Sequence, residues 1–157
     1  ALPYMKVALG VASPNGDITD VSQLKDKTLL INKGTTADLY FTKNHPEIKL
    51  LKFDQNTETF GAMLDGRGDA IAHDNTLLFA WTKSNPGFKV GIRSLGDQDV
   101  IAPAVKKGND ELRKWLDDLI VKLAGEKFFH ADYDATLAPV YGDDIKADNV
   151  VIEGGKL

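Results

Sequence analysis

The sequence predicts an α/β fold of three layers, in which a mostly parallel sheet carries helices on both faces and is followed by a C-terminal helical extension. Short apolar runs alternate with helix-like segments between about residues 20 and 105, which is typical of repeated strand–helix–strand units. A strong helical repeat of apolar residues follows at 112–123. The length of 157 residues, with 43% hydrophobic and 27% charged residues, fits one domain or one domain with an appendage.

The composition excludes several classes of function. The net charge is −4 and no basic run is present, so nucleic acid and anionic membrane surfaces are poor candidate partners. Cysteine is absent, which excludes disulfides, thiolate nucleophiles and cysteine-based metal sites. No apolar run approaches the roughly 20 residues of a membrane span. Residues 1–4 lack the charged and apolar regions of a signal peptide.

The first part of the chain contains four predicted strands with helical segments between them. Pro14-Asn15-Gly16-Asp17 supplies a turn after the first strand. Pro46 ends a helix, because the residue before a proline is pushed out of the helical region, and Gly66 ends the helix that begins at Asn56. Strands are expected at 5–12, 28–31, 48–53 and 69–74, and helical segments at 22–26, 37–44, 56–65 and 75–83.

Two further strands are expected at 88–92 and 99–107, because each is mostly apolar and the polar stretch 94–98 separates them. The last third of the chain is helical in pattern. Its strongest feature is an apolar stripe at the helical spacing i, i+3, i+4, i+7, i+8, i+11. The apolar stripe consists of Leu112, Trp115, Leu116, Leu119, Ile120 and Leu123.

A second C-terminal helix is expected from Phe128 to about Leu137, since Phe128, Phe129, Tyr133 and Leu137 fall on one face and Pro139 follows. The remainder of the chain reads as a loose tail. It contains one candidate short strand, at 150–152.

The junction Gly34-Thr35-Thr36 is the first candidate site. A strand that runs into this sequence at the start of a helix leaves backbone N–H groups unpaired. With the positive end of the helix dipole, these groups can bind a carboxylate or another small anion. The alternative is that Thr35 or Thr36 simply caps the helix. The single glycine matches neither a P-loop nor a dinucleotide-binding fingerprint.

Asp74 and His73 form the second candidate site. Asp74 ends a buried strand, where open α/β sheets place ligand-binding groups. Its carboxylate could bind an ammonium group, or it could cap the following helix. His73 could act as an acid, a base or a ligand contact, although a lone histidine at a strand end is more often structural. Together the two strand ends offer donors for a carboxylate and an acceptor for an ammonium, the two groups of an α-amino acid.

The sequence points to neither a cofactor nor a metal. The three histidines at 45, 73 and 130 have no zinc-ligand spacing. No nucleophile motif such as G-x-S-x-G is present. We therefore expect a binding protein and not an enzyme.

Nearly the whole chain resembles the second lobe and C-terminal part of the polar amino-acid-binding proteins of bacterial ABC importers. These proteins are type 2 periplasmic binding proteins. The stretches "KGTTADLYFTKN", "DQNTETF" and "AHDNTLL" are most similar to the cysteine-binding members. The longer matching segments are "PYMKVALGV", "VSQLKDKTLLINKGTTADLYF", "LKFDQNTETFGAMLDGRGDAIAHDNTLL" and "LGDQDVIAPAVKKGNDELRKWLDDLI".

The resemblance implies a two-lobed protein that closes on its ligand by a hinge motion. It implies that Gly34, Thr35 and Thr36 bind the ligand carboxylate and that Asp74 binds its ammonium group. Asn32 and His73 correspond to positions that contact or shape the ligand side chain. The implied ligand is cysteine or another polar amino acid, and the implied partner of the full-length protein is an ABC permease.

The resemblance also implies a division into three segments. Residues 1–12 form a strand that crosses the hinge, 13–105 form the ligand-binding second lobe, and 106–157 form helices that pack on the first lobe in relatives. The first lobe, with its carboxylate-binding arginine, is not found in this sequence, so we expect half of a binding site and weak affinity. Without that lobe the apolar stripe is expected to mediate homodimerisation or exchange of the helical arm.

The implied location is the periplasm, or the cell surface through a lipid anchor. Two alternatives use the same scaffold. One is a dehydratase-like enzyme in which His73 and Asp74 act as acid and base. The other is the ligand-binding domain of a receptor or sensor.

Overall fold

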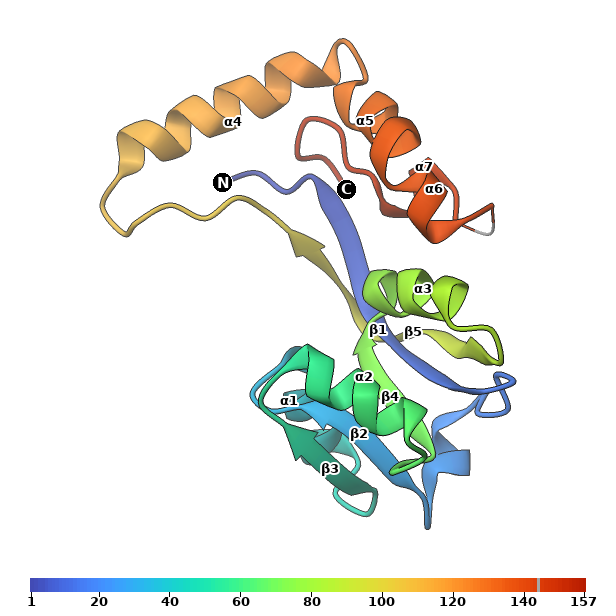
Figure 1. Ribbon diagram of the computed structural model, residues 1–157. Helices are drawn as coiled ribbons and strands as arrows, with labels where there is room; N and C mark the ends of the chain where they lie inside the picture. Colours follow the sequence, from blue (N-terminus) through green and yellow to red (C-terminus); the bar gives the residue numbers. More distant parts are fainter. Residues whose placement is uncertain (144) are drawn as a thin grey trace. The chain divides into compact units, whose positions relative to one another are not determined.

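The computed structural model describes residues 1–143 and 145–157 (Figure 1). The chain divides into two compact units. One consists of Ala8–Gln98, and the other combines Ala1–Val7 with Asp99–Leu157. The long strands β1 (Met5–Pro14) and β5 (Phe88–Ile101) each contribute residues to both units. The three-segment division expected from the sequence stays a prediction.

A five-stranded sheet with the order β3-β2-β4-β1-β5 forms the first unit. Its parallel part consists of β2 (Thr28–Asn32) between β3 (Lys49–Phe53) and β4 (Ala70–Asp74). β1 pairs with β4 in the antiparallel direction. The predicted α/β class is therefore confirmed, with a mixed sheet whose parallel strands come from strand–helix–strand units.

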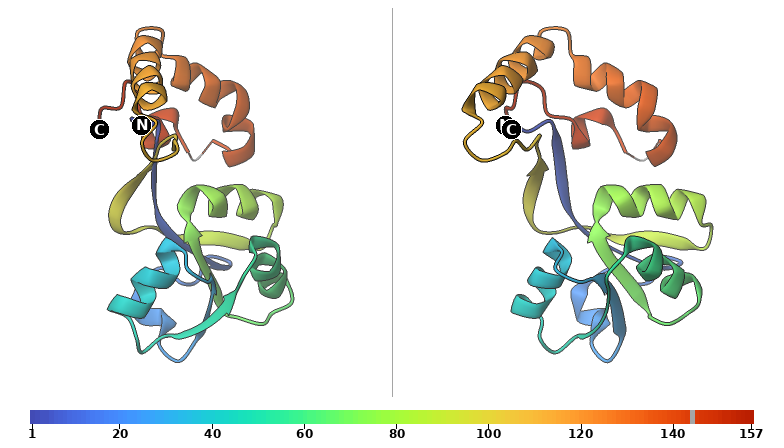
Figure 2. Two further views of the ribbon diagram at one scale, coloured as in Figure 1. Left: turned by 90° about the vertical axis from the view of Figure 1, so that its left-hand side faces the viewer. Right: turned by 60° about the vertical axis from the view of Figure 1, so that its left-hand side comes forward.

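Helices cover both faces of this sheet (Figure 2). On one face, Phe41 of α1 (Thr36–Asn44) is buried with Leu29 and Ile31 of β2, near the short 3₁₀ helix η1 (Val21–Leu24). On the other face, α2 (Asn56–Leu64) and α3 (Asn75–Ser84) pack on Leu30 and on β4. Alternate residues of β2 thus supply the two halves of the core, as the period of a strand requires.

The expectation of separate strands at 88–92 and 99–107 is wrong. β5 runs without interruption from Phe88 to Ile101, and no strand follows it in the described residues up to 109. The polar residues at 94, 97 and 98 are exposed. They are tolerated because β5 is the last strand in the sheet order and does not need an apolar residue at every second position. Gly96, at φ +72°, supplies a local bend.

The second unit is mainly helical. The predicted long helix is α4 (Asp110–Ala124), which the Asn109 side chain caps by accepting the Leu112 N–H at 3.2 Å. Ile120 of the apolar stripe is buried, whereas Leu112 is 42% and Trp115 59% exposed. The stripe is therefore only partly covered by this chain. The remaining helices are α5 (Phe128–Thr136), α6 (Ala138–Tyr141) and α7 (Ala147–Val150).

The expectation of a loose C-terminal tail is also wrong. Ile152 is 1% exposed, and its N–H donates to the carbonyl of Tyr4 at 3.0 Å. Val151 forms an isolated antiparallel bridge with Met5. The Tyr133 hydroxyl donates to the carbonyl of Ile145 at 2.8 Å. These contacts join the tail to α5 and to the N-terminal segment, which is far away in sequence.

Candidate functional site

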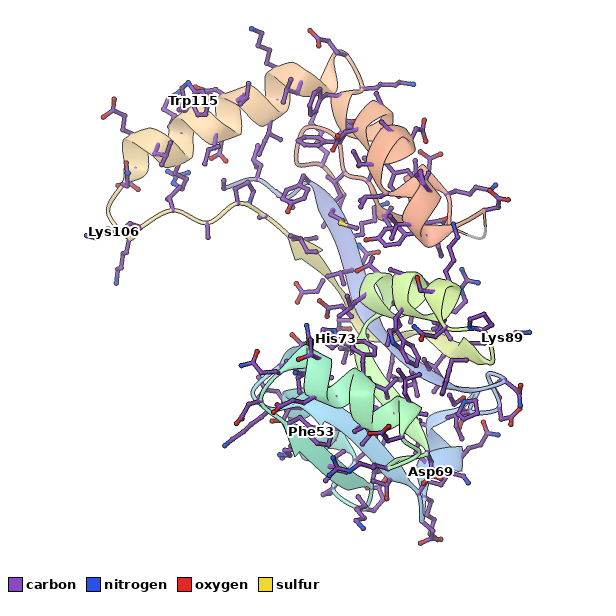
Figure 3. The ribbon with its side chains drawn as sticks, in the orientation of Figure 1. Phe53, Asp69, His73, Lys89, Lys106 and Trp115 are labelled. Atoms are coloured by element: carbon purple, nitrogen blue, oxygen red, sulfur yellow. The ribbon has the colours of Figure 1, made fainter. Side chains whose placement is uncertain are left out.

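The six candidate residues all lie in the unit Ala8–Gln98, at the carboxyl ends of two neighbouring strands. β2 and β4 are parallel, with Leu29 opposite Ala70 and Leu30 opposite Ile71. Their carboxyl ends therefore meet at one edge of the sheet, where α/β folds place ligands. Asn32, Gly34, Thr35 and Thr36 follow β2 into α1, and His73 and Asp74 end β4. His73 is labelled in Figure 3, where its ring approaches α2.

Thr35 caps α1. Its hydroxyl donates to the carbonyl of Asn32 at 2.7 Å and accepts the N–H of Asp38 at 3.4 Å. The capping alternative raised by the sequence is thus the observed role of this side chain. Its hydroxyl is already engaged within the chain and has little capacity left for a ligand.

The N–H of Gly34 is not unpaired, as the sequence pattern predicted, but has a partner within the chain. It donates to the Asp38 carboxylate at 2.8 Å. The same carboxylate accepts the Thr42 hydroxyl at 3.1 Å and pairs with the Lys52 ammonium at 2.7 Å. Asp38 lies in the first turn of α1, where a short side chain can reach back to the preceding loop. This intrachain carboxylate occupies the place that a ligand carboxylate was expected to take at Gly34.

Electrostatics keep Asp38 ionised. Burial by itself would raise the pKa of the Asp38 carboxyl group, but the Gly34 N–H, the Lys52 ammonium and the Thr42 hydroxyl together lower that pKa below its ordinary value. Asp38 is therefore a permanent negative charge beside the first turn of α1, and Lys52 compensates it.

The donors that remain at this junction belong to Thr36. Its N–H is at the first position of α1, so the helix supplies no acceptor for it. Thr36 is exposed, and within the described part of the chain neither its N–H nor its hydroxyl has a hydrogen-bond partner. Together with the helix dipole, these two groups keep the capacity to bind an anion.

Asp74 occupies the N-cap position of α3, but its side chain makes no capping hydrogen bond. Asp74 is half-buried, and among the described residues its carboxylate has neither a hydrogen bond nor an ion pair. An aspartate at this position normally caps its helix. The structure instead leaves a free carboxylate at the edge of the sheet, which is the group expected to bind an ammonium.

His73 is held as a neutral imidazole. Its Nδ1 accepts the N–H of Asp74 at 2.7 Å, and its Nε2 lies 3.0 Å from Asn56 Oδ1, to which it donates. Burial lowers the pKa of His73, and the nearby Asp74 carboxylate opposes that effect only in part. Both ring nitrogens are engaged, so the imidazole offers no free position for proton transfer or for a direct hydrogen bond to a ligand.

Asn32 is buried, and its Oδ1 accepts the hydroxyl of Thr59 at 2.9 Å. Thr59 and Asn56, both in the first turn of α2, were not predicted from the sequence as part of the site. A pattern in the sequence could have identified Asn56 and Thr59. α2 follows β3, a third parallel strand ending at the same edge, and residues three apart share one face of a helix.

Within 1–143 and 145–157, no cluster of three or more histidine, aspartate or glutamate side chains is arranged to hold a metal ion. None of the helices described there combines the length and the apolar character needed to cross a membrane.

No protein-family model matches the chain, but individual proteins do. A putative ABC transporter arginine-binding protein of Escherichia coli K12 is 26% identical over 136 residues, which cover 84% of this chain and 56% of that protein. The crystal structure of a cysteine-binding protein from Campylobacter jejuni has a TM-score of 0.91 at 67% identity, covering 96% of this chain and 61% of that chain.

A receptor for L-cysteine from Neisseria gonorrhoeae has a TM-score of 0.90 at 59% identity, covering 98% of this chain and 63% of that chain. The homologues of this chain are thus the solute-binding proteins of amino-acid ABC transporters, and its fold matches one lobe of a type 2 periplasmic binding protein. The particular similarity to cysteine-binding members, predicted from the sequence, is confirmed. The chain spans about six tenths of the length of these three relatives.

Proposed function

We propose that this protein binds a polar amino acid, with cysteine as the first candidate, as the solute-binding component of an ABC importer. The observation that carries the proposal is the free carboxylate of Asp74 at the same sheet edge as the unpaired donors of Thr36. Asp74 binds the ligand ammonium, and Thr36 with the α1 N-terminus binds the ligand carboxylate. The similarity to cysteine-binding structures supports cysteine as the ligand.

The affinity of this chain for a free amino acid is expected to be weak. A hydrogen bond to a charged group contributes about 1.5–3 kcal/mol, and this edge supplies few such bonds. Association costs about 4–15 kcal/mol of translational and rotational freedom. The balance favours a dissociation constant of about 1 mM or weaker. Groups opposite this edge would be needed for tight binding.

Nuclear magnetic resonance titration of the ¹⁵N-labelled chain measures binding in this range. Cysteine should shift the amide signals of Thr36 and Asp74 in a saturable manner. Cysteamine, which lacks the carboxylate, should leave Thr36 unshifted, and 3-mercaptopropionate, which lacks the ammonium, should leave Asp74 unshifted. Asp74→Asn should abolish saturation by cysteine, whereas the exposed Asp65→Asn should not. Equal binding by Asp74→Asn and the native chain would refute the proposal.

The protein is proposed to act without catalysis, outside the cytoplasm, in the periplasm or anchored at the cell surface, and to deliver its ligand to an ABC permease. The names of the homologues as transporter binding proteins support this role. The engagement of both His73 nitrogens gives no support to the dehydratase alternative. Assay of prephenate turnover by this chain tests the point, and turnover that depends on His73 would contradict it.

Homodimerisation through the apolar stripe stays a prediction. The exposure of Leu112 and Trp115 supports it, because apolar surface on this scale favours association. Sedimentation velocity should then show a dimer that Trp115→Glu converts to a monomer. A native chain that sediments as a monomer at about 100 μM would contradict the prediction. The free energy of dimerisation would then be weaker than about −5 kcal/mol, which is too weak for a stable dimer.

A further inference from the structure

The Asp74 carboxylate makes no capping hydrogen bond although the residue stands at the start of a helix. Asp74 has φ −53° and ψ 130° at the N-cap of α3, a position where an aspartate side chain usually accepts an N–H of the first helical turn. Here the side chain accepts none. The N–H of Asp74 itself donates to Nδ1 of the preceding His73 at 2.7 Å. The His73 imidazole thus contacts the main chain of Asp74, the residue whose carboxylate is free.

This contact requires one particular form of His73. Nδ1 can accept a hydrogen bond only when it carries no proton, so the ring proton must be on Nε2. Asn56 Oδ1 lies 3.0 Å from Nε2 and accepts a hydrogen bond from Nε2–H. Phe60 stacks on the ring at a centroid separation of 6.3 Å and an interplanar angle of 26°. Asn56 and Phe60 therefore hold a neutral imidazole in one tautomer and one orientation.

We propose that Asn56 is a positioning residue of the amino-acid site. By accepting a hydrogen bond from Nε2–H, its amide fixes the His73 tautomer that accepts the Asp74 N–H, and so helps to hold the main chain from which the Asp74 carboxylate projects. The inference rests on the proposed function, and it gives Asn56 and His73 a role without ligand contact. It also explains why a neutral asparagine, and not an acid, pairs with this histidine.

Replacement of Asn56 by aspartate changes the charge at this position with almost no change in shape. A carboxylate that accepts a hydrogen bond from Nε2–H stabilises the imidazolium form and raises the pKa of His73. The imidazolium carries a proton on Nδ1, so it can no longer accept the Asp74 N–H. Its positive charge also competes with a ligand ammonium for the Asp74 carboxylate. Two independent effects therefore weaken binding in the same direction.

The groups around His73 simplify the interpretation of pH effects. Asp74 follows it on β4, Asn56 and Phe60 face it from α2, and Gly10 is its partner on β1. Among these described neighbours Asp74 is the one that carries an ionisable side chain, and a histidine titrates in the range of about pH 6 to 8. A change of affinity over that range reports the protonation of His73.

The test compares Asn56→Asp with Asn44→Asp, a matched change at an exposed asparagine near the end of α1. Imidazole ¹⁵N shifts report the tautomer and protonation of His73, and the Thr36 and Asp74 amide signals report cysteine binding. In the native chain His73 should be protonated on Nε2 alone. At about pH 6, Asn56→Asp should bind cysteine about tenfold more weakly than Asn44→Asp, and the difference should shrink by about pH 8 as His73 deprotonates.

A second variant covers the case in which Asn56→Asp fails to fold. Asn56→Ala removes the acceptor without adding charge and should give a mixture of His73 tautomers with a severalfold loss of affinity. The inference is overturned if His73 in the native chain carries its proton on Nδ1, or if either folded Asn56 variant binds cysteine as well as Asn44→Asp does. Failure of the native chain to bind any amino acid would instead refute the proposed function itself.

Discussion

The buried hydrogen bond between Thr59 and Asn32 is the most direct test of how α2 supports the site. Thr59 is fully buried and Asn32 is 4% exposed. The Thr59 hydroxyl donates to Asn32 Oδ1 at 2.9 Å and also lies 3.1 Å from the carbonyl of Gln55. Thr59→Val removes the hydroxyl and keeps the size and branching of the side chain. The perturbation is therefore the loss of one donor at a packed position.

The expected cost follows from what each acceptor loses. The Gln55 carbonyl still accepts the N–H of residue 59 at 3.1 Å, so it stays satisfied. Asn32 Oδ1 becomes a buried acceptor without a partner, which costs about 1–3 kcal/mol. The added methyl group returns up to about 0.8 kcal/mol if it packs well. The net loss of unfolding free energy should be about 1–2 kcal/mol.

Urea denaturation followed by tryptophan fluorescence measures this loss. The ring centroid of Trp81 lies 5.0 Å from that of Phe60 and 4.8 Å from that of Phe88. Its fluorescence emission therefore reports the folding of the unit Ala8–Gln98. Trp115 lies in the other unit, and a Trp115→Phe background removes its signal. The midpoint should fall with an unchanged slope. Thr57→Val, the same change at an exposed position of the same helical turn, should shift stability by less than about 0.5 kcal/mol.

A double variant distinguishes the loss of one hydrogen bond from a general disruption of the packing. Replacing both partners with apolar groups removes the unpaired acceptor, so Asn32→Leu combined with Thr59→Val should be more stable than Thr59→Val alone. A Thr59→Val protein as stable as the native one would refute the account. So would a double variant whose losses simply add.

Three further predictions concern other parts of the chain. Asp38→Asn should lower stability by about 1–3 kcal/mol at neutral pH. Because the native pKa of Asp38 is lowered from 3.8, its stabilisation is present above that value and is lost as pH falls through the native pKa, so the variant should lose less stability in acid urea titrations. His130 hydrogen-bonds Glu153 and Asp148, which raise its pKa from 6.5. That stabilisation is complete below the pKa of His130 in the unfolded chain and is lost as pH rises through its native pKa. The unfolding free energy measured by Trp115 fluorescence should therefore fall toward alkaline pH, and His130→Gln should remove this dependence. Gly91→Ala would force a Cβ against the Ile18 carbonyl oxygen and should cost about 1–3 kcal/mol, measured by thermal melting; an unchanged midpoint would contradict it.

Local periodicity predicted the elements of this fold where burial imposes a pattern. β2 and β4 are buried on both faces, so their apolar runs were visible in the sequence. α4 places its apolar residues along one stripe, so its helical period was visible too. The continuous strand β5 was missed at its polar middle, because an edge strand can continue where its side chains meet solvent. The order of the C-terminal tail was missed because it depends on contacts with residues 4 and 5.

Local sequence patterns were enough to predict that the ends of β2 and β4 reach the carboxyl edge of the sheet, because strand ends and helix starts follow from such patterns. The tertiary structure alone decided which groups there are free. The N–H of Gly34 is taken by Asp38, and the nitrogens of His73 are taken by Asn56 and the Asp74 main chain, whereas the Asp74 carboxylate has no partner among the described residues. Hydrogen bonding is satisfied by groups brought together from different elements, so its outcome depends on side-chain conformations and packing that no local pattern encodes.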